Sequence, residues 1–431
     1  MSLRSIKELK NIRGKRILVR VDFNVPILSA SGSEKEQNRA SRATEGSRGI
    51  SRVADDTKIA SAVPTIEFLV KKGAKVILMT HFGRPEAKKQ KSTKAKKQND
   101  LSVVGERLSE LLKNKVRMIE KWDFKEIEKA VGEMSAGEVL MLPNLRLHPG
   151  EEKNSLSFAR DLLKLGQIYV NEAFSVSHRA HGSVVRVPKM LPSASYAGLQ
   201  FIKEVEILGS VLLNPKRPFV VLMGGGKITD KMAMLSTMVN RADLILVGGA
   251  LATHFFKAMG YEVGASRIEK EGVRLAKKLL RSKKIILPKD LVVGTMDGQK
   301  AWVEEVALKH KNIKALKQEN ICEKPYGIWD IGPQTILEYA KYIKTARLLI
   351  WNGPMGLYEV KRYSHGTAAL GRLFAARSKG RAFGIAGGGE TIDALRQTGI
   401  AEYVDFISTG GGAMIEYLSS MKLPGIEALK T

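Results

Sequence analysis

Cysteine is nearly absent from this chain, since Cys322 is the only one among 431 residues. A lone cysteine cannot form an internal disulfide, which fits the reducing cytoplasm. No apolar run reaches the length of a membrane span, and the N-terminal stretch MSLRSIKELK lacks the apolar core of a secretory signal. We therefore expect a cytoplasmic protein that has no membrane partner.

Acidic residues are scarce relative to basic ones. The chain has 71 Lys and Arg against 44 Asp and Glu, so its net charge is 71 − 44 = +27. Such an excess is compatible with anionic small substrates, nucleic acid, an acidic membrane surface or a generally basic surface. Part of it lies in the lysine tract KKQKSTKAKK, residues 88–97, and in Arg39, Arg42, Arg48 and Arg52. Neither tract interleaves the aromatics needed to stack on single-stranded bases, so we interpret both as solvated loops.

Two common nucleotide-binding signatures are also missing. The stretch MGGGKITDK, residues 223–231, follows an apolar run as a phosphate loop would, but Ile228 stands after Lys227 where a P-loop has Ser or Thr. No G-x-G-x-x-G follows the first predicted strand with an acid about 20 residues on, which argues against a nicotinamide oxidoreductase. The glycines and lysines of this stretch need another explanation.

Short β-branched apolar runs alternate with helical patterns along the chain, which is typical of parallel α/β sheets. The length favours two domains over a single core. Helical patterns cover LSVVGERLSELLK and DTKIASAVPTIEFLVKKG, in which Pro64 marks a helix start or a kink. The predicted strands are residues 16–22, 75–80, 138–142, 167–172, 218–223, 243–248, 346–351, 382–386 and 404–408.

Two segments interrupt this alternation. Residues 29–53 combine turn-forming and charged residues without an apolar period, so we expect an exposed, disordered insertion. Residues 187–197, rich in proline and small side chains, indicate a domain boundary. The helical stretch after them ends at Asn214-Pro215, as helices do before proline, and is the predicted connection between two domains.

Nearly every predicted strand ends in a polar or glycine-rich cluster. In the first half these clusters are DFNVP, HFGRP, PNLRL and NEAFSVSHRAH; in the second half they are GGGKITDK, GGA, NGPMG, GGGE and STGGG. Open α/β sheets bind ligands at the carboxyl ends of their strands. We therefore expect one edge of each sheet to be a binding site.

The predicted edge of the first sheet is rich in arginine and histidine. The planar fork of arginine matches phosphate and carboxylate, so this edge predicts a small, multiply anionic ligand. The spacing of its last two histidines alone would suggest a metal, but no cysteine or carboxylate pattern supports one. The candidate residues are Asp22, Asn24, His81, Arg84, Arg146, His178, Arg179 and His181.

The predicted edge of the second sheet is rich in glycine. Glycines let backbone N–H groups approach phosphates and helix N-termini add positive potential, so this edge predicts a nucleotide site. Lys227 and Lys231 are four residues apart and would share one helix face. An anion site and a nucleotide site in two domains indicate a kinase, and an acceptor that is an ionised carboxylate would need no general base. A non-catalytic protein that binds nucleic acid or another polyanion is the alternative.

The motifs VRVDFNVP, HFGRP, NLR, AFSVSHRAH, GGGKITDK, NGPMGLYE, GGGET and STGGGA, in this order, closely resemble the phosphoglycerate kinase family. The resemblance runs from Lys15 to the final LPGIEAL. It implies two Rossmann-like domains whose parallel sheets face each other across a cleft and are joined by a hinge helix. The implied segments are a 3-phosphoglycerate domain (1–190), a linker with the hinge helix (191–216), a nucleotide domain (217–415) and an end that returns to the first domain (416–431).

The resemblance also implies the reaction and the residues that serve it. The enzyme would transfer a phosphoryl group reversibly between ATP and the carboxylate of 3-phosphoglycerate, giving ADP and 1,3-bisphosphoglycerate, with magnesium and on domain closure. It would be a monomer that does not bind nucleic acid. The implied substrate residues are Asp22, Asn24, Lys58, His81, Arg84, Arg146, His178, Arg179 and His181. The implied nucleotide residues are Gly225, Gly226, Lys227, Lys231, Gly248, Asn352, Gly353, Glu359, Gly387, Gly388, Gly389, Glu390 and Thr391.

Within these sets, Lys58, Lys231 and Arg179 are the implied catalytic cations. Glu359 would hold the ribose hydroxyls and Glu390 would serve the metal. Three departures from the family pattern stand out: Lys58 replaces an arginine, Glu390 replaces an aspartate, and residues 29–53 are longer than the usual connection.

Overall fold

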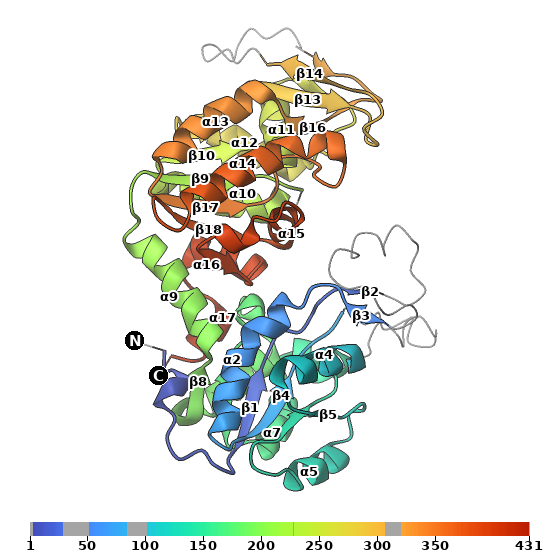
Figure 1. Cartoon of the computed structure of the whole chain (residues 1–431), viewed down its shortest axis with the longest axis vertical. Helices are drawn as coiled ribbons and strands as arrows, with labels where there is room; N and C mark the ends of the chain where they lie inside the picture. Colours follow the sequence, from blue (N-terminus) through green and yellow to red (C-terminus); the bar gives the residue numbers. More distant parts are fainter. Residues whose placement is uncertain (1–2, 29–50, 84–100, 227, 307–319, 431) are drawn as a thin grey trace. The chain divides into compact units, whose positions relative to one another are not determined.

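The computed structural model describes residues 3–28, 51–83, 101–226, 228–306 and 320–430. The lysine tract and most of the predicted insertion therefore lie outside the described residues. The chain divides into two compact units, residues 1–206 with 422–431, and residues 207–421 (Figure 1). The division falls inside α9 (Leu199–Leu213), the helix that the sequence predicts to connect two domains.

The predicted segments, 1–190, 191–216, 217–415 and 416–431, stay a prediction, and the compact units group the residues differently. The first unit extends past residue 190, because β8 (Ser195–Ala197) pairs with β7 (Ile168–Asn171) in its sheet. The returning end begins at residue 422 rather than 416, because α16 (Gly412–Ser420) packs on α10 (Ile228–Arg241) of the second unit. Which substrate each unit binds stays a prediction from the sequence.

The first unit is built on a six-stranded parallel sheet in the order β5-β6-β4-β1-β7-β8. Its strands not yet given are β1 (Arg16–Arg20), β4 (Lys75–Met79), β5 (Val116–Met118) and β6 (Val139–Met141). Its main helices are α2 (Thr57–Lys71), α4 (Ser102–Leu112), α5 (Phe124–Gly132), α6 (Pro149–Glu152), α7 (Leu156–Leu165) and α8 (Val187–Met190).

Alternate residues of the central strand β1 face opposite sides of this sheet, as the period of a strand requires. Ile17 and Val19 join the apolar core under α2 and α4. Leu18 lies on the other side, against Gly166 at the end of α7, where any side chain would overlap it. Helices therefore cover both faces, and the edge where the strands end is left for polar side chains (Figure 1).

Two local expectations change in this unit. Pro64 lies inside α2, which excludes the helix start and leaves the kink as the remaining prediction. Residues 52–53, predicted as part of the insertion, form the short strand β3 (Arg52–Val53), which pairs antiparallel with β2 (Ile27–Leu28). The described chain therefore ends at residue 28 and resumes at residue 51 beside one two-stranded ladder.

The second unit has a six-stranded parallel sheet in the order β12-β10-β9-β17-β18-β19. In chain order this is 3-2-1-4-5-6, the dinucleotide-fold order, whereas the first sheet reads 3-4-2-1-5-6 because β6 inserts beside β4. The strands are β9 (Phe219–Met223), β10 (Leu244–Val247), β12 (Ile285–Ile286), β17 (Leu348–Asn352), β18 (Phe383–Gly387) and β19 (Phe406–Ser408). The remaining helices are α11 (Gly249–Ala258), α12 (Lys270–Leu279), α13 (Pro333–Thr345), α14 (His365–Arg377), α15 (Gly389–Gln397) and, in the first unit, α17 (Pro424–Glu427).

Both faces of the second sheet are also covered by helices (Figure 1). Ala386 of β18 belongs to the core that contains α13 and α14, whereas Gly387, the next residue, contacts Met414 of α16. The unit also contains an antiparallel sheet that the sequence did not predict, formed by β13 (Asp290–Gly294), β14 (Ala301–Glu305) and β16 (Gly327–Ile331).

The predicted fold class is confirmed: the protein is an α/β protein with two parallel sheets. All the predicted strands are present, with ends shifted by at most two residues. In both sheets the second strand in chain order lies on one side of the first strand, and a later strand lies on its other side. The strand order therefore reverses between β1 and β7 in the first sheet and between β9 and β17 in the second. Such switch points open a crevice at the carboxyl ends of the strands. In the part of the chain that the structure describes, no helix is long and apolar enough to cross a membrane.

Candidate active site

Asp22 stands at the centre of the switch point of the first sheet, just after β1. Its Oδ2 accepts a hydrogen bond from Lys58 Nζ at 2.7 Å and another from the hydroxyl of Ser175, which follows β7. Burial favours the protonated carboxyl, but the charge of Lys58 and the hydrogen bonds from Lys58 and Ser175 outweigh it and hold the pKa of Asp22 well below its ordinary value. The carboxylate thus stays ionised and fixes the Lys58 ammonium at the sheet edge.

His81 follows β4 and lies 3.7 Å from the Asp22 carboxylate, measured from Nδ1 to Oδ1. Its Nδ1 also lies 3.2 Å from Nη2 of Arg20, a buried residue at the end of β1. A guanidinium can only donate, so Nδ1 is the acceptor and the imidazole is neutral. Burial first, and then the nearby arginines and Lys58, lower the pKa of His81 well below its usual range. His81 therefore offers this edge a hydrogen bond rather than a charge.

A buried polar network extends behind this edge. Arg20 Nε donates to Ser183 Oγ at 2.9 Å, and both the backbone N–H and the hydroxyl of Ser183 donate to the carboxylate of Glu151, at 2.8 and 2.6 Å. Glu151 is fully buried, and its Oε1 lies 3.8 Å from His181 Nδ1. Burial and the charges of Arg20 and other cations lower the pKa of His181 to about 4. The network connects the end of β1 to the turn that carries His178 and His181.

Asn24 and Arg146 meet at the HFGRP loop. Gly83 N–H donates to Asn24 Oδ1 at 2.9 Å, and the guanidinium of Arg146 donates to the carbonyl of Gly83. Asn144 holds the same loop from the end of β6, since its side chain accepts from Phe82 N at 3.1 Å and donates to Phe82 O at 2.7 Å. These bonds bring three of the predicted clusters into one assembly.

The SHRAH turn completes this edge. Arg179 Nε donates to His178 Nε2 at 3.3 Å, so this ring nitrogen is an acceptor. The chain end packs against the same turn: Gly425 N–H donates to Ser177 O at 2.8 Å, and Ala428 joins a small apolar cluster with Val176 and Val184. Residues 425–428 thus pack against this turn and support its position.

The last two predicted residues of this edge are Arg84 and Lys58. Arg84 lies outside the described residues. Lys58, near the start of α2, forms the ion pair with Asp22. Arg52 is a residue of β3 and pairs with Leu28 of β2. The cation beside Asp22 is therefore the lysine.

The switch point of the second sheet gathers the predicted glycines around Lys231. This lysine is buried on α10, donates to the carbonyl of Gly224, and lies 3.9 Å from Glu390 Oε2. Gly225 and Gly353 both have positive φ, at 76° and 95°, and a side chain at either position would overlap Lys231 Nζ. Only glycine fits there, so the strand ends close tightly around the ammonium. Lys227 lies outside the described residues.

The end of β17 is tied to the start of α15. Asn352, which is buried, donates from Nδ2 to Gly387 O at 3.1 Å, and Gly353 N–H donates to Thr391 Oγ1 at 2.6 Å. Residues 387–389 form the turn from β18 into α15, and Glu390 is exposed in the first turn of that helix. The N-terminus of α15 and the loop after β17 therefore share one surface where anionic groups are favoured.

The other predicted nucleotide residues lie around this surface. Gly248 precedes α11, beside Met355 of the loop after β17, and Gly226 leads into α10. Glu359 is exposed on the same loop, next to Tyr358. Within the described ranges, no group of three or more His, Cys, Asp or Glu side chains is arranged to hold a metal ion by itself.

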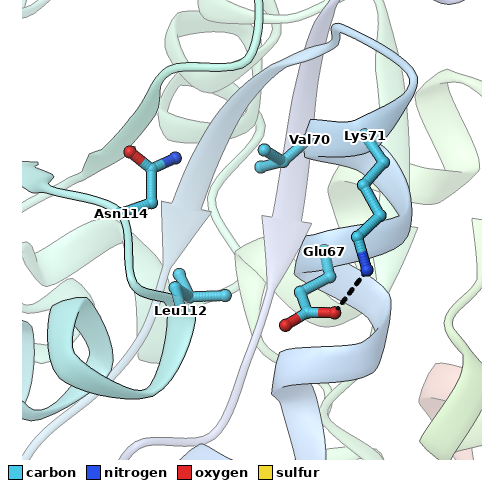
Figure 2. Close-up of a pocket in the computed structure, with 5 residues that line it drawn as sticks. All are labelled: Glu67, Val70, Lys71, Leu112 and Asn114. Atoms are coloured by element: carbon cyan, nitrogen blue, oxygen red, sulfur yellow. Dashed lines mark hydrogen bonds and ion pairs between the residues drawn. The ribbon is translucent and has the colours of Figure 1, made fainter.

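A small hollow of about 100 Å³ lies elsewhere, between the C-terminal ends of α2 and α4 (Figure 2). Glu67, Val70, Lys71, Leu112 and Asn114 line it, and its two charges pair with each other at 2.8 Å. Both helices end just before a strand begins, so this hollow is at the amino edge of the sheet. Ligands of open α/β sheets bind at the opposite edge.

Sequence reasoning missed Arg20, Glu151, Ser175, Ser183 and Asn144. Arg20 had a signal, because an arginine inside a strand that is otherwise apolar must find buried partners. Asn144 and Ser175 lie within two of the quoted clusters. Glu151 carries no such signal, since it looks like any acidic residue at the start of a helix.

Comparison with known proteins agrees with this geometry. The family model described as phosphoglycerate kinase matches residues 6–421. The phosphoglycerate kinases of Moorella thermoacetica and Coprothermobacter proteolyticus are 39% and 40% identical to the chain, and each match covers all of this chain and 99% of the relative.

Solved structures give the same result. Phosphoglycerate kinase from Coxiella burnetii superposes with a TM-score of 0.75 at 31% identity, over 99% of both chains. The enzyme from Pyrococcus horikoshii gives a TM-score of 0.80 at 28% identity, over 99% of this chain and 98% of that one. The enzymatic interpretation therefore holds over the polyanion-binding alternative. The chain belongs to the phosphoglycerate kinase family, and it is a phosphotransferase of glycolysis with a carboxyl group as acceptor.

Proposed function

We propose that the Asp22 edge of the first unit binds 3-phosphoglycerate and that the Lys231 edge of the second unit binds ATP or ADP. The observation that carries the first assignment is the Lys58–Asp22 ion pair at the switch point, which neighbours His81 and the loop held by Arg146. Several cations around the ionised Asp22 carboxylate suit a ligand that has both phosphate and carboxylate groups. Asp22 can also accept a hydrogen bond from a hydroxyl group of that ligand.

The remaining residues of the first edge have distinct roles in this proposal. Arg146 and Arg179, with Arg84, bind the phosphate of 3-phosphoglycerate, while the neutral histidines His81, His178 and His181 donate single hydrogen bonds. Asp22 and Asn24 orient the hydroxyl group. The carboxylate of the substrate then lies toward Lys58, whose charge helps to balance the incoming phosphoryl group.

In the second unit, the proposed site runs from the glycines to Glu359. Gly225, Gly226 and residues 387–389 let backbone N–H groups approach the phosphates, together with Lys227 and Thr391. Asn352, Gly353 and Gly248 border the nucleotide, and Glu359 accepts the ribose hydroxyls. Lys231, held at the switch point, stabilises the phosphoryl group during transfer.

The residues present fit a magnesium ion that binds with the nucleotide. Magnesium keeps several waters and is held by one or two carboxylates plus substrate phosphates. Glu390 is a partly exposed carboxylate beside Lys231, at the start of α15, and supplies such a ligand. When bound with ATP, magnesium would neutralise phosphate charge.

The chemistry in this proposal needs no general base, because the acceptor is a carboxylate that is already ionised near neutral pH. Catalysis then depends on alignment and charge neutralisation, supplied by Lys58, Arg179 and Lys231. Since the two substrates bind to different units, transfer also requires the units to close. Small-angle scattering should give a smaller radius of gyration with both substrates than with neither, and an unchanged radius would count against closure.

We further propose that the enzyme works as a monomer in the cytoplasm. All the residues proposed for the two edges are present in the sequence of one chain, and the lone cysteine is buried, which supports a monomer without a disulfide. Light scattering that gave twice the chain mass at working concentration would contradict the monomer.

Activity is tested by a coupled assay for ATP-dependent formation of 1,3-bisphosphoglycerate from 3-phosphoglycerate, with magnesium present. The site assignment is tested by saturation kinetics. Arg179→Ala should raise KM for 3-phosphoglycerate and not for ATP, whereas Glu359→Ala should do the reverse. Equal effects on both substrates would refute the division of the substrates between the two edges.

A further inference from the structure

The loop after β17 is attached to α15 at two points. The first is the bond from Gly353 N–H to Thr391 Oγ1 in the opening turn of the helix. The second is a hydrogen bond of 2.7 Å from the Tyr358 hydroxyl to Asp393 Oδ2. Asp393 is itself oriented by Gln397, which donates to the same oxygen from one turn further on, at 2.9 Å.

Two exposed carboxylates lie next to these attachments in the sequence. Glu359 follows Tyr358 on the loop, and Glu390 lies in the first turn of α15. Burial, the bond to Asp393 and the charges of Asp393, Glu359 and Glu390 all raise the pKa of the Tyr358 phenol. The Tyr358–Asp393 bond is the attachment nearest to Glu359, since the Gly353–Thr391 bond lies six residues before it on the loop. The raised pKa also keeps the Tyr358 hydroxyl protonated, and hence a donor.

We propose that the Tyr358–Asp393 hydrogen bond is a latch that fixes Glu359 relative to the start of α15, which makes Tyr358 a positioning residue for the nucleotide. The proposal rests on the proposed function, in which Glu359 holds the ribose and the start of α15 holds the phosphates. One nucleotide must reach both groups at once. A latch that sets their separation before binding removes part of the ordering cost of binding.

The latch predicts an effect on the nucleotide alone. Tyr358→Phe removes only the donor, and KM for ATP should rise about three- to fivefold, the scale for one partly exposed hydrogen bond. KM for 3-phosphoglycerate should stay within about 1.5-fold of the wild-type value, because its proposed site is in the other unit. Asp393→Ala should reproduce the effect, whereas Asp393→Asn keeps an acceptor oxygen and should stay near the wild type.

Tyr363→Phe is the matched control. It also removes a phenol hydroxyl that donates within the second unit, to Thr295 O, but that bond is away from α15. This variant should lower the thermal midpoint and leave KM for ATP unchanged, which separates positioning from general stability.

The decisive experiment is steady-state kinetics with ATP and 3-phosphoglycerate varied in turn, on these variants and on Glu359→Ala. A rise in KM for ATP in Tyr358→Phe and Asp393→Ala, with recovery in Asp393→Asn, supports the latch. A wild-type KM in Tyr358→Phe, alongside a raised KM in Glu359→Ala, overturns it. If Glu359→Ala also leaves KM for ATP unchanged, the nucleotide assignment itself is wrong, and the latch is refuted with it.

Discussion

Lys58 Nζ lies 2.7 Å from Asp22 Oδ2, and this ion pair joins the start of α2 to the end of β1 at the switch point of the first sheet. The lysine side chain is 31% exposed while the aspartate is 7% exposed, so the lysine is the more accessible member of the pair. Asp22 therefore holds the Lys58 ammonium in place at the edge where the anionic substrate is proposed to bind.

Lys58→Ala should lower kcat by about 10²-fold or more, the scale for losing one donor that stabilises a transition state. Lys58→Arg should retain or raise kcat, because a guanidinium keeps the charge and can hold two oxygens at once. KM for 3-phosphoglycerate should change less than kcat in both variants. Initial rates over a range of both substrates measure these values.

Arg52→Ala is the control for this prediction. Arg52 is the nearest described arginine upstream in the sequence, but it lies on β3, and the cation beside Asp22 is Lys58. We expect near-normal turnover. Normal turnover in Lys58→Ala together with its loss in Arg52→Ala would show that the catalytic cation is Arg52.

Both sheets and the two edges follow from local patterns in the sequence. Apolar runs such as RILVR predict strands because their residues are buried on both faces of a parallel sheet, and each run is followed at once by the polar or glycine cluster that ends it. The carboxyl ends of parallel strands lie on one edge, so clusters that are far apart in the chain come together, as Asp22 and Ser175 do.

Other features could not be predicted, because they depend on contacts between distant residues that have no local pattern. Arg20 and Ser183 are 163 positions apart, and no sequence pattern near either residue predicts that the two form a hydrogen bond. Lys231 lies on α10, but its burial against Gly224 was not predicted, because it depends on the room that the glycines after β9 and β17 leave for its side chain. The strands β13, β14 and β16 form a separate antiparallel sheet that a search for parallel strands passes over.

Glu151→Ala should destabilise the first unit strongly. The change leaves the N–H and the hydroxyl of Ser183 without their buried acceptor, and each unsatisfied group costs about 1–3 kcal/mol. We expect the free energy of unfolding in urea to fall by about 3 kcal/mol or more. Glu152→Ala is the control, because its side chain is 60% exposed and lies 3.7 Å from Arg146, beyond hydrogen-bond distance, so we expect a smaller loss. Equal losses in both variants would mean that the buried network contributes nothing of its own.

The lysine tract at residues 88–97 should steer the anionic substrate. It follows the HFGRP cluster directly in the sequence, and a dense positive charge raises the local concentration of anions. Replacing its lysines with glutamine should raise KM for 3-phosphoglycerate at low salt and much less at high salt, where screening acts over about 3–10 Å. A change in KM that is independent of salt, or no change, would leave the tract as a solvated loop.

His254 is a buried histidine on α11 that uses both ring nitrogens. Nε2 accepts from Glu269 N–H at 2.9 Å, so the ring proton is on Nδ1, which donates to Ala250 O at 2.7 Å. The imidazole is therefore neutral in the folded protein. Burial is the main cause that lowers its pKa below the ordinary value of 6.5.

This lowered pKa makes the stability of the second unit depend on pH. The unfolded chain binds a proton at His254 as the pH falls below 6.5, while the folded protein resists it, so stability is full above this pH and is lost below it. The loss is at most about 1.4 kcal/mol per pH unit for one group. Urea unfolding of the second unit at pH 7.5, 6.5 and 5.5 should show this decline in the wild type and a smaller one in His254→Gln. His365→Gln, which removes an exposed histidine of the same unit, is the matched control. An unchanged decline in His254→Gln would show that His254 does not take up the proton on unfolding.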